Sequence, residues 1–343
     1  MNIAVVGAGV IGLTSAIAVK EALPKSRVTI FADTFTPDTT GDGSAGLWGP
    51  FILGDTPEVD IIRWAGVTHR WFEHFWRSGL APETGIGLIP VVRITSKDEW
   101  KMPAWSKIVY GAEKLNDQNL RRFNEEHRSN YKNGISFVTW TAEPTVLLPW
   151  LMNRFTDAGG IIRNKRINSF DELAENGYDT VINCSGLGAH KLINDPSLVA
   201  VRGQVTRVKA PWVYSVFLEE DNPGNYIIPN INTVVLGGTG QVGDYDINIR
   251  DSDTKFVRDG CCKILPGLEQ CKVVSHWAGL RPKRSEVRVE REIRSMPNGN
   301  KFSVIHNYGH GGAGVTICWG CALDVVDIIK KSNDKNFEVS AKL

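Results

Sequence analysis

The chain has 343 residues, enough for two domains or for one pair of interleaved domains. Hydrophobic residues make up 42% and charged residues 22%, which is ordinary for a globular protein. The formal net charge of +1 argues against nucleic acid or an anionic membrane as a partner, because no basic excess is present. Residues 3–19 carry no charge, but glycines interrupt them and no basic segment precedes them. We therefore expect neither a membrane span nor a signal peptide, and a protein that is not secreted.

The N-terminal segment has the pattern of a dinucleotide-binding turn. Apolar periodicity predicts a strand, a helix and a second strand over residues 3–6, 10–22 and 28–31. Three glycines at the spacing G-x-G-x-x-G follow the first strand and continue into the helix: Gly7, Gly9 and Gly12. This spacing lets a pyrophosphate approach the backbone at a helix N-terminus. Asp33 follows about 20 residues after the last glycine, where a carboxylate binds a ribose hydroxyl.

The middle of the chain changes from a parallel to an antiparallel pattern. Residues 150–158 predict a helix, and residues 180–183 predict another parallel strand that ends in Cys184, Ser185 and Gly186. Short alternating runs then predict antiparallel strands over 204–208, 226–229 and 234–238. The polar loop 219–225 interrupts them, as a lid or as a plain hairpin connection.

A second glycine-rich turn, residues 309–314, precedes a helix predicted over 315–330. A helix N-terminus favours an anion. A reduced flavin carries negative charge at its N1/O2 edge, whereas a nicotinamide has little use for such a site. The turn therefore favours FAD over NAD, although the first motif alone would also fit an NAD-dependent dehydrogenase.

Six cysteines show no secreted disulfide framework. Cys318 and Cys321, together with His306 and His310, have a spacing that resembles that of zinc ligands. Both cysteines lie inside an apolar helical run, however. We expect buried, reduced thiols and no metal site.

Seven short motifs give the chain a family resemblance. They are F-T-P-D-T-T, A-G-L-W, V-R-G-Q, Y-I-I-P, G-G-T, L-R-P and H-N-Y-G-H-G-G, over residues 35–40, 45–48, 201–204, 226–229, 237–239, 280–282 and 306–312. Over essentially its whole length the chain resembles the D-amino-acid oxidase and D-aspartate oxidase family. The resemblance implies an α/β, Rossmann-like FAD-binding domain of the glutathione-reductase type, interleaved with a mixed, antiparallel-sheet substrate domain. It would divide the chain into an FAD domain (1–75, 140–195 and 275–331), a substrate domain (76–139 and 196–274) and a flexible tail (332–343).

The resemblance also implies a reaction and a set of site residues. The reaction is oxidative deamination, in which a D-amino acid, O₂ and water give a 2-oxo acid, ammonia and H₂O₂. Arg281 and Tyr226 would bind the substrate carboxylate, and the Gly312 carbonyl would accept from the amine, so that no protein base is needed. The implied FAD contacts are Val6, Gly7, Ala8, Gly9, Gly12, Asp33, Thr39, Thr40, Ala45, Gly46, Leu47, Ile167, Ser185, Gly311, Gly312, Ala313, Gly314, Val315 and Thr316.

Two regions depart from the family pattern. Asn222 stands where oxidases of neutral substrates carry a lid tyrosine, and Glu219 and Gly240 stand where D-aspartate oxidases carry arginines. Residues 148–151 and 183–188 nevertheless resemble the aspartate branch, whereas the last third resembles the neutral branch. We expect a slight preference for acidic substrates, as in a D-aspartate oxidase. The alternatives are neutral or basic D-amino acids, a glycine- or sarcosine-type amine oxidase, and a flavoprotein without turnover.

The last three residues, Ala341, Lys342 and Leu343, resemble the S-K-L peroxisomal address. They predict the peroxisomal import receptor as a partner and the peroxisome as the location, with the cytoplasm as the alternative. The sequence predicts no oligomeric state.

Overall fold

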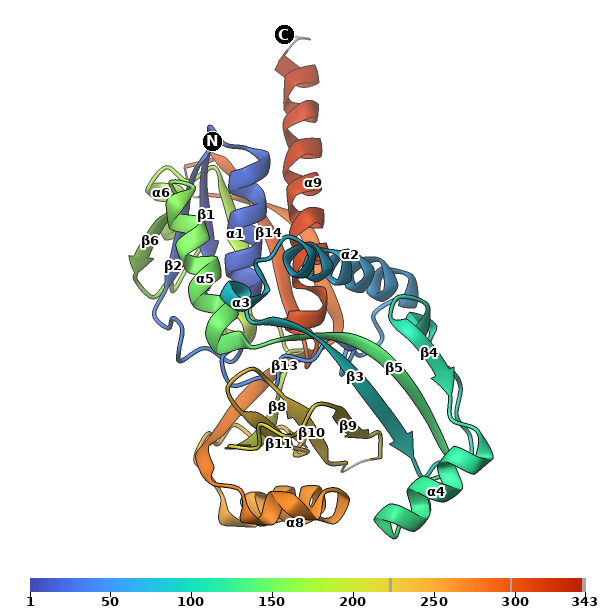
Figure 1. The fold of residues 1–343 in the computed structure, drawn as a ribbon. Helices are drawn as coiled ribbons and strands as arrows, with labels where there is room; N and C mark the ends of the chain where they lie inside the picture. The colour runs from blue at the N-terminus through green and yellow to red at the C-terminus, as the bar shows by residue number, and fades with distance from the viewer. Residues whose placement is uncertain (222–223, 297, 341–343) are drawn as a thin grey trace.

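The computed structural model describes residues 1–221, 224–296 and 298–340, with side chains described through residue 332. Its described residues form a 14-stranded sheet in the order β4-β5-β3-β9-β10-β11-β8-β13-β14-β7-β1-β2-β6, with β12 paired to β8 beside this path. Figure 1 shows the sheet running from β6, β2 and β1 at one end of the molecule to β5 and β4 at the other. Asn222 and the C-terminal tripeptide, residues 341–343, lie outside the described residues.

One part of the sheet is parallel and buried between helices. Its strands are β14 (Lys301–His310), β7 (Thr180–Asn183), β1 (Asn2–Val6), β2 (Arg27–Ala32) and β6 (Ile161–Asn164). The strands predicted at 3–6, 28–31 and 180–183 are confirmed. Their apolar runs are buried because α1 (Val10–Ala22), α5 (Pro144–Asp157) and α9 (Gly314–Ser340) pack together on one face, as Figure 1 shows, and residues of the 167–174 segment pack on the other.

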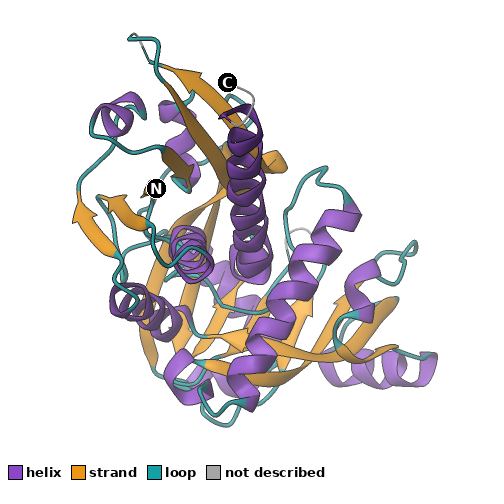
Figure 2. Cartoon of the chain, turned by 90° about the horizontal axis from the view of Figure 1, so that it is seen from above, coloured by secondary structure: helices purple, strands orange, loops and turns teal. Residues whose placement is uncertain are grey.

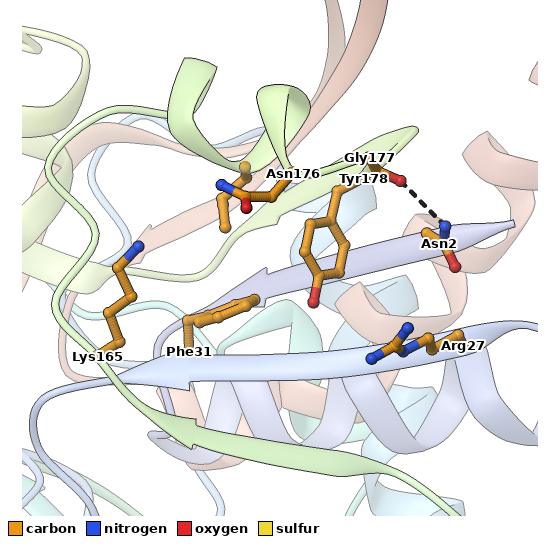
Figure 3. Close-up of a pocket in the computed structure, with 8 residues that line it drawn as sticks. Asn2, Arg27, Phe31, Lys165, Asn176, Gly177 and Tyr178 are labelled. Carbon is orange, nitrogen blue, oxygen red and sulfur yellow. Dashed lines mark hydrogen bonds between the residues drawn. The ribbon is translucent and has the colours of Figure 1, made fainter.

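The other part of the sheet is mainly antiparallel, which confirms the predicted pattern. Its strands are β3 (Ile86–Thr95), β4 (Tyr110–Lys114), β5 (Asn133–Ala142), β8 (Val199–Val208), β9 (Val216–Glu219), β10 (Tyr226–Pro229), β11 (Val234–Gly237) and β12 (Gln241–Val242). Helix α8 (Asp251–Ile264) covers β8 and β11, and α4 (Asp117–His127) lies at the far end of β3 and β5 (Figures 1 and 2).

A single long strand, β13 (Val273–Ser295), joins the two parts. Its first half pairs with β8 and its second half with β14, and the register with β14 shifts between Lys283 and Arg288. Arg281 therefore lies on the strand that runs through both parts, next to the point where the pairing changes partner.

The remaining described helices are α2 (Glu58–Arg77), α3 (Ala81–Thr84), α6 (Asp171–Glu175) and α7 (Ala189–Leu192). Three 3₁₀ turns span Ala104–Lys107, Gly186–Gly188 and Pro266–Gln270. No helix within the described ranges is long and apolar enough to cross a membrane.

Two predicted helix boundaries are wrong. The helix predicted over 150–158 begins earlier, at Pro144, because proline is favoured at the first helical position. The helix predicted over 315–330 continues to Ser340, because residues 331–340 contain neither glycine nor proline to end it. The division into two interleaved domains stays a prediction.

Candidate active site

The three glycines of the first turn, Gly7, Gly9 and Gly12, have different surroundings. Gly7 has φ +111°, and a Cβ there would lie 2.4 Å from the Cys184 carbonyl oxygen. A Cβ on Gly12 would lie 1.9 Å from the Gly7 carbonyl oxygen, so helix and turn are in direct contact. A Cβ on Gly9 would meet no described atom within 4 Å. The turn thus leaves open space at the glycine where a pyrophosphate needs to approach the backbone.

The start of α1 is suited to an anion. Its N-cap residue is Gly9, so no side chain caps the first turn. The backbone N–H groups there remain available, and the helix dipole favours negative charge at this end. Val6 and Ala8, which flank Gly7, are both buried. The backbone of this turn is therefore what a ligand would contact.

Three more of the predicted FAD contacts, Asp33, Ser185 and Ile167, belong to segments near the first glycine turn. Asp33 follows the end of β2 and pairs with Arg166 at 3.4 Å. Ser185 lies beside Gly7, and its hydroxyl donates to the Asn183 side chain at 2.6 Å. Ile167 is buried in the cluster that also contains Val6, so its side chain faces the core. Only the backbone of Ile167 is left to reach a cofactor.

Residues 36–49 form an anchored loop along the site. The buried carboxylate of Asp42 accepts from Thr36 Oγ1 at 2.6 Å, and from Thr39 N at 2.9 Å and Oγ1 at 2.6 Å. Further along, the Gly46 carbonyl accepts from Ala142 N at 2.8 Å. Gly46 has φ +72°, and a Cβ there would lie 1.9 Å from the Ala142 carbonyl oxygen. The contacts predicted on this loop, which are Thr39, Thr40, Ala45, Gly46 and Leu47, therefore share one fixed segment.

Asp42 was not among the residues predicted from the sequence. The local signal for it is an acidic residue between two glycines, Gly41 and Gly43, which predicts a turn held by a side chain.

The second glycine turn adjoins the first. Gly311 has φ +54°, and a Cβ on it would lie 1.7 Å from the Ile52 carbonyl oxygen. Helix α9 begins at Gly314, where a Cβ would lie 3.6 Å from Val10 Cγ1 at the start of α1. Ala313 and Val315 are buried, and Thr316 exchanges hydrogen bonds of 3.1 Å with the backbone of Gly49. The two helix starts thus lie together, as an extended anionic ligand requires.

Arg281 and Tyr226 lie side by side at the sheet junction. Arg281 Nη1 donates to the Thr239 carbonyl at 3.1 Å and to the Arg202 carbonyl at 3.4 Å. Burial raises the pKa of the Tyr226 phenol, and the charge and hydrogen bond of Arg281 oppose that rise. The phenol therefore stays protonated, as a donor, at neutral pH. Two backbone carbonyls hold one end of the guanidinium, which leaves its other donors for a ligand.

Glycines on three adjacent strands make room for these side chains. A Cβ on Gly203 of β8 would lie 2.3 Å from the guanidinium of Arg281, and one on Gly237 of β11 would lie 2.1 Å from the ring of Tyr226. A Cβ on Gly279 of β13 would lie 1.8 Å from the indole of Trp277. The glycines thus fix where these side chains lie. Sequence analysis did not assign the glycines or Trp277 to the site, although isolated glycines within strands indicate a close approach.

Phe51 connects Gly312 with Arg281. Gly312 N donates to the Phe51 carbonyl at 3.2 Å, and a Cβ on Gly312 would lie 2.4 Å from Phe51 Cδ1. The Phe51 ring centre lies 6.0 Å from Arg281 Cζ. Gly312 itself is exposed. The structure therefore brings all three predicted catalytic residues to one place and adds Phe51, which sequence analysis missed.

The cysteines are free thiols, and Cys184, Cys261, Cys318 and Cys321 are buried. This confirms the predicted packing role of Cys318 and Cys321. The two ring nitrogens of His306 instead lie 2.9 Å from Glu292 Oε2 and 3.3 Å from Asn183 Nδ2. Across the described ranges, no group of three or more His, Cys, Asp or Glu side chains is placed to hold a metal ion.

Comparisons with known proteins agree with this geometry. The family model described as "FAD dependent oxidoreductase" matches residues 2–328. Among relatives, the D-amino acid oxidase of Dugesia ryukyuensis is 37% identical over 96% of this chain and 97% of its own length. The D-aspartate oxidase of Homo sapiens is 35% identical over 96% of this chain and 95% of its own.

A solved structure shows the same fold. The glycine oxidase from Geobacillus kaustophilus superposes with a TM-score of 0.76 at 18% identity, covering 96% of this chain and 94% of that one. The open glycine, the uncapped start of α1 and the neighbouring start of α9 together fit an FAD molecule. The chain therefore belongs to the family of FAD-dependent oxidoreductases that contains the D-amino-acid and D-aspartate oxidases.

Proposed function

We propose that this protein oxidises D-amino acids with FAD as cofactor and O₂ as final acceptor. A D-amino acid, O₂ and water give a 2-oxo acid, ammonia and H₂O₂. The observation that supports this function best is the pairing of Arg281 with Tyr226 beside two adjoining glycine-rich turns. The names of the relatives support the same reaction.

The residues of the two turns would hold the cofactor. The open backbone at Gly9 and the start of α1 would bind the pyrophosphate, and Asp33 the adenosine ribose. The loop with Thr39 to Leu47 and the start of α9 would line the flavin end. When bound, FAD accepts the two electrons that the substrate gives up, and O₂ takes them away as H₂O₂.

The protein's part in the reaction is to orient the substrate. Arg281 would bind the α-carboxylate through two parallel N–H donors, and the Tyr226 hydroxyl would donate to the same group. The carbonyl of Gly312, an exposed residue, would accept from the amine. With its carboxylate and amine both fixed, the substrate can present its Cα hydrogen to the cofactor in only one enantiomer. Catalysis then depends on orientation and charge placement.

The names of the relatives do not decide which D-amino acids this protein prefers. The relatives include enzymes named for D-aspartate and enzymes named for D-amino acids in general, at similar identity. The expected lean towards acidic substrates thus stays a prediction. We also propose import into peroxisomes through Ala341, Lys342 and Leu343. A fluorescent protein fused to the N-terminus, with and without these three residues, tests this, and an unchanged distribution after deletion would contradict it.

An H₂O₂ assay with matched D- and L-enantiomers tests the proposed reaction. We expect H₂O₂ only with D-enantiomers, in equal amount to the 2-oxo acid formed. A purified protein that carries FAD but produces no H₂O₂ with any D-amino acid would contradict the proposal.

A further inference from the structure

We infer that the substrate pocket selects D-amino acids with apolar side chains and that Phe51 makes this selection. The inference rests on the proposed oxidation of D-amino acids and names the substrate class of that same site. It differs from the acidic preference expected from the sequence background.

Phe51 lies between the groups that would hold the carboxylate and the amine of a bound substrate. Its ring centre is 6.0 Å from Arg281 Cζ, and its Cδ1 is 2.4 Å from the position of a Cβ on Gly312. Arg281 and Gly312 are the groups that would hold the carboxylate and the amine. A substrate spanning the two therefore lies against the phenyl ring. Phe51 is 51% exposed, so this ring gains burial when a substrate covers it.

A second aromatic ring lies on the same face of β13 as Arg281. Trp277 is four residues before Arg281, and the two side chains alternate with Ala278 and Leu280. The indole lies over Gly279 and Gly43, whose Cβ positions would be 1.8 Å and 2.1 Å from it. Besides Tyr226 and the carbonyls of Thr239 and Arg202, the described surroundings of Arg281 thus include the Phe51 ring and, on the same face of β13, the Trp277 indole.

A second cation near Tyr226, Arg207, is already committed to other groups. Arg207 interacts electrostatically with Tyr226, but it is only 9% exposed. Its Nη2 donates to the carbonyls of Asp42 at 3.3 Å and Ser44 at 3.1 Å, and its Nη1 donates to Asn230 Oδ1 at 3.3 Å. Arg207 therefore cannot turn towards a substrate without releasing the 42–44 loop. A second substrate carboxylate would be buried against aromatic rings without a partner, which is unfavourable.

The acidic residues of the 219–221 segment are committed as well. Glu219 accepts from the Tyr131 hydroxyl and from Asn225 N, and Glu220 pairs with Arg93 at 2.8 Å. Asp221 accepts from Thr95 Oγ1 at 2.6 Å and Ser96 N at 3.1 Å. Glu220 and Asp221 thus hold the segment to β3 and its end, and Glu219 ties it to Tyr131 and Asn225. These carboxylates are not free to pair with the side chain of a basic substrate, which again leaves apolar side chains as the matching class.

Steady-state kinetics of the FAD-loaded enzyme with D-Met, D-Phe, D-Asp, D-Glu and D-Arg test the inference. We expect kcat/KM for D-Met and D-Phe to exceed that for D-Asp and D-Arg at least tenfold. Equal or higher values for D-Asp or D-Arg would overturn it while leaving the proposed oxidation in place. No turnover of any of them by the FAD-loaded enzyme would instead contradict the proposed function, and with it the inference.

Variants of Phe51 test the residue itself. F51A should lower kcat/KM for D-Met and D-Phe about tenfold, mainly through KM, because apolar contact is lost. F51R should raise kcat/KM for D-Asp relative to D-Met at least tenfold. I293R is the matched control, since Ile293 is 58% exposed and lies in the half of β13 that pairs with β14. Unchanged selectivity in F51A and F51R, with FAD content equal to the parent, would overturn the assignment to Phe51.

Discussion

Gly203 on β8 lies directly under the guanidinium of Arg281 on β13, and a Cβ on Gly203 would come within 2.3 Å of both Nη1 and Nη2. The two strands pair antiparallel, with Gly203 opposite Gly279. A glycine is thus required at position 203 for Arg281 to keep its place. The carboxylate-binding group is fixed by the sheet beneath it as much as by its own hydrogen bonds.

The G203A variant tests this contact. The added methyl group has to displace the guanidinium, because the contact is far shorter than van der Waals distance. We expect KM for D-amino acids to rise at least tenfold with little loss of bound FAD. G240A is the matched control, since a Cβ on Gly240 meets nothing within 4 Å. An unchanged KM in G203A would contradict the fixed position of Arg281.

Removing the Arg281 guanidinium should impair turnover of D-amino acids more than the G203A substitution does. R281A should lower kcat/KM by about two to four orders of magnitude, because truncating one partner of a buried charge pair costs about 3–5 kcal/mol. R281K should recover part of the loss, since a lysine keeps the charge without the planar fork. Steady-state kinetics together with the visible FAD spectrum separate this effect from cofactor loss. Parent-like kcat/KM in R281A would remove Arg281 from the substrate site.

Both glycine-rich turns could be predicted from the sequence because their physical demands select one residue type. A backbone at φ +111° at Gly7, or a Gly12 Cβ position 1.9 Å from the Gly7 carbonyl oxygen, admits only glycine, so the requirement is visible in the chain. The parallel strands were predictable for a similar reason. Burial on both faces requires continuous apolar runs, such as the one over residues 3–6.

The missed residues act through contacts between distant segments. Phe51 belongs to the site because its loop packs on Gly312 and lies near Arg281, and no local pattern around residue 51 indicates either contact. Asp42 and Arg207 hold the same loop from positions far apart in the chain. The continuation of α9 to Ser340 was missed because the sequence there is polar, and polarity alone does not end a helix.

Two substitutions in the first turn should separate cofactor binding from folding. G9A places a methyl group in space where no described atom lies within 4 Å, so the apoprotein should unfold at the parent temperature while FAD affinity falls. G12A forces Gly7 and α1 apart and should lower both the unfolding temperature of the apoprotein and its FAD affinity. Flavin titration and thermal unfolding of the apoprotein measure the two effects. Parent-like FAD affinity in G9A would contradict the placement of the pyrophosphate at this turn.

His69 should make the protein sensitive to acid. Its ring lies among Trp48, Tyr110 and Trp140, its Nε2 has no hydrogen-bond partner among the described residues, and burial lowers the pKa of its imidazole to about 4. Between this value and about 6.5, the unfolded chain binds a proton that the folded chain does not. Folding stability attributable to His69 is therefore fully present above pH 6.5. It falls by about 2 kcal/mol between pH 7 and pH 5.

The H69F variant should remove this part of the pH dependence while keeping the ring contacts. Urea unfolding at pH 7 and pH 5 measures it, and we expect a smaller loss of stability at pH 5 than in the parent. H74F, at an exposed position on the same helix α2, is the control and should keep the parent dependence. An identical pH dependence in H69F and the parent would show that His69 does not titrate as its burial implies.

The central claim is that FAD bound between the two glycine turns oxidises a D-amino acid held by Arg281 and Tyr226. Anaerobic mixing of the FAD-loaded protein with D-Met and, separately, with L-Met tests it most directly. We predict that D-Met bleaches the visible absorption of FAD, that L-Met does not, and that R281A fails to bleach at the same D-Met concentration. An unbleached spectrum with every D-amino acid, or equal bleaching by both enantiomers of methionine, would contradict the claim.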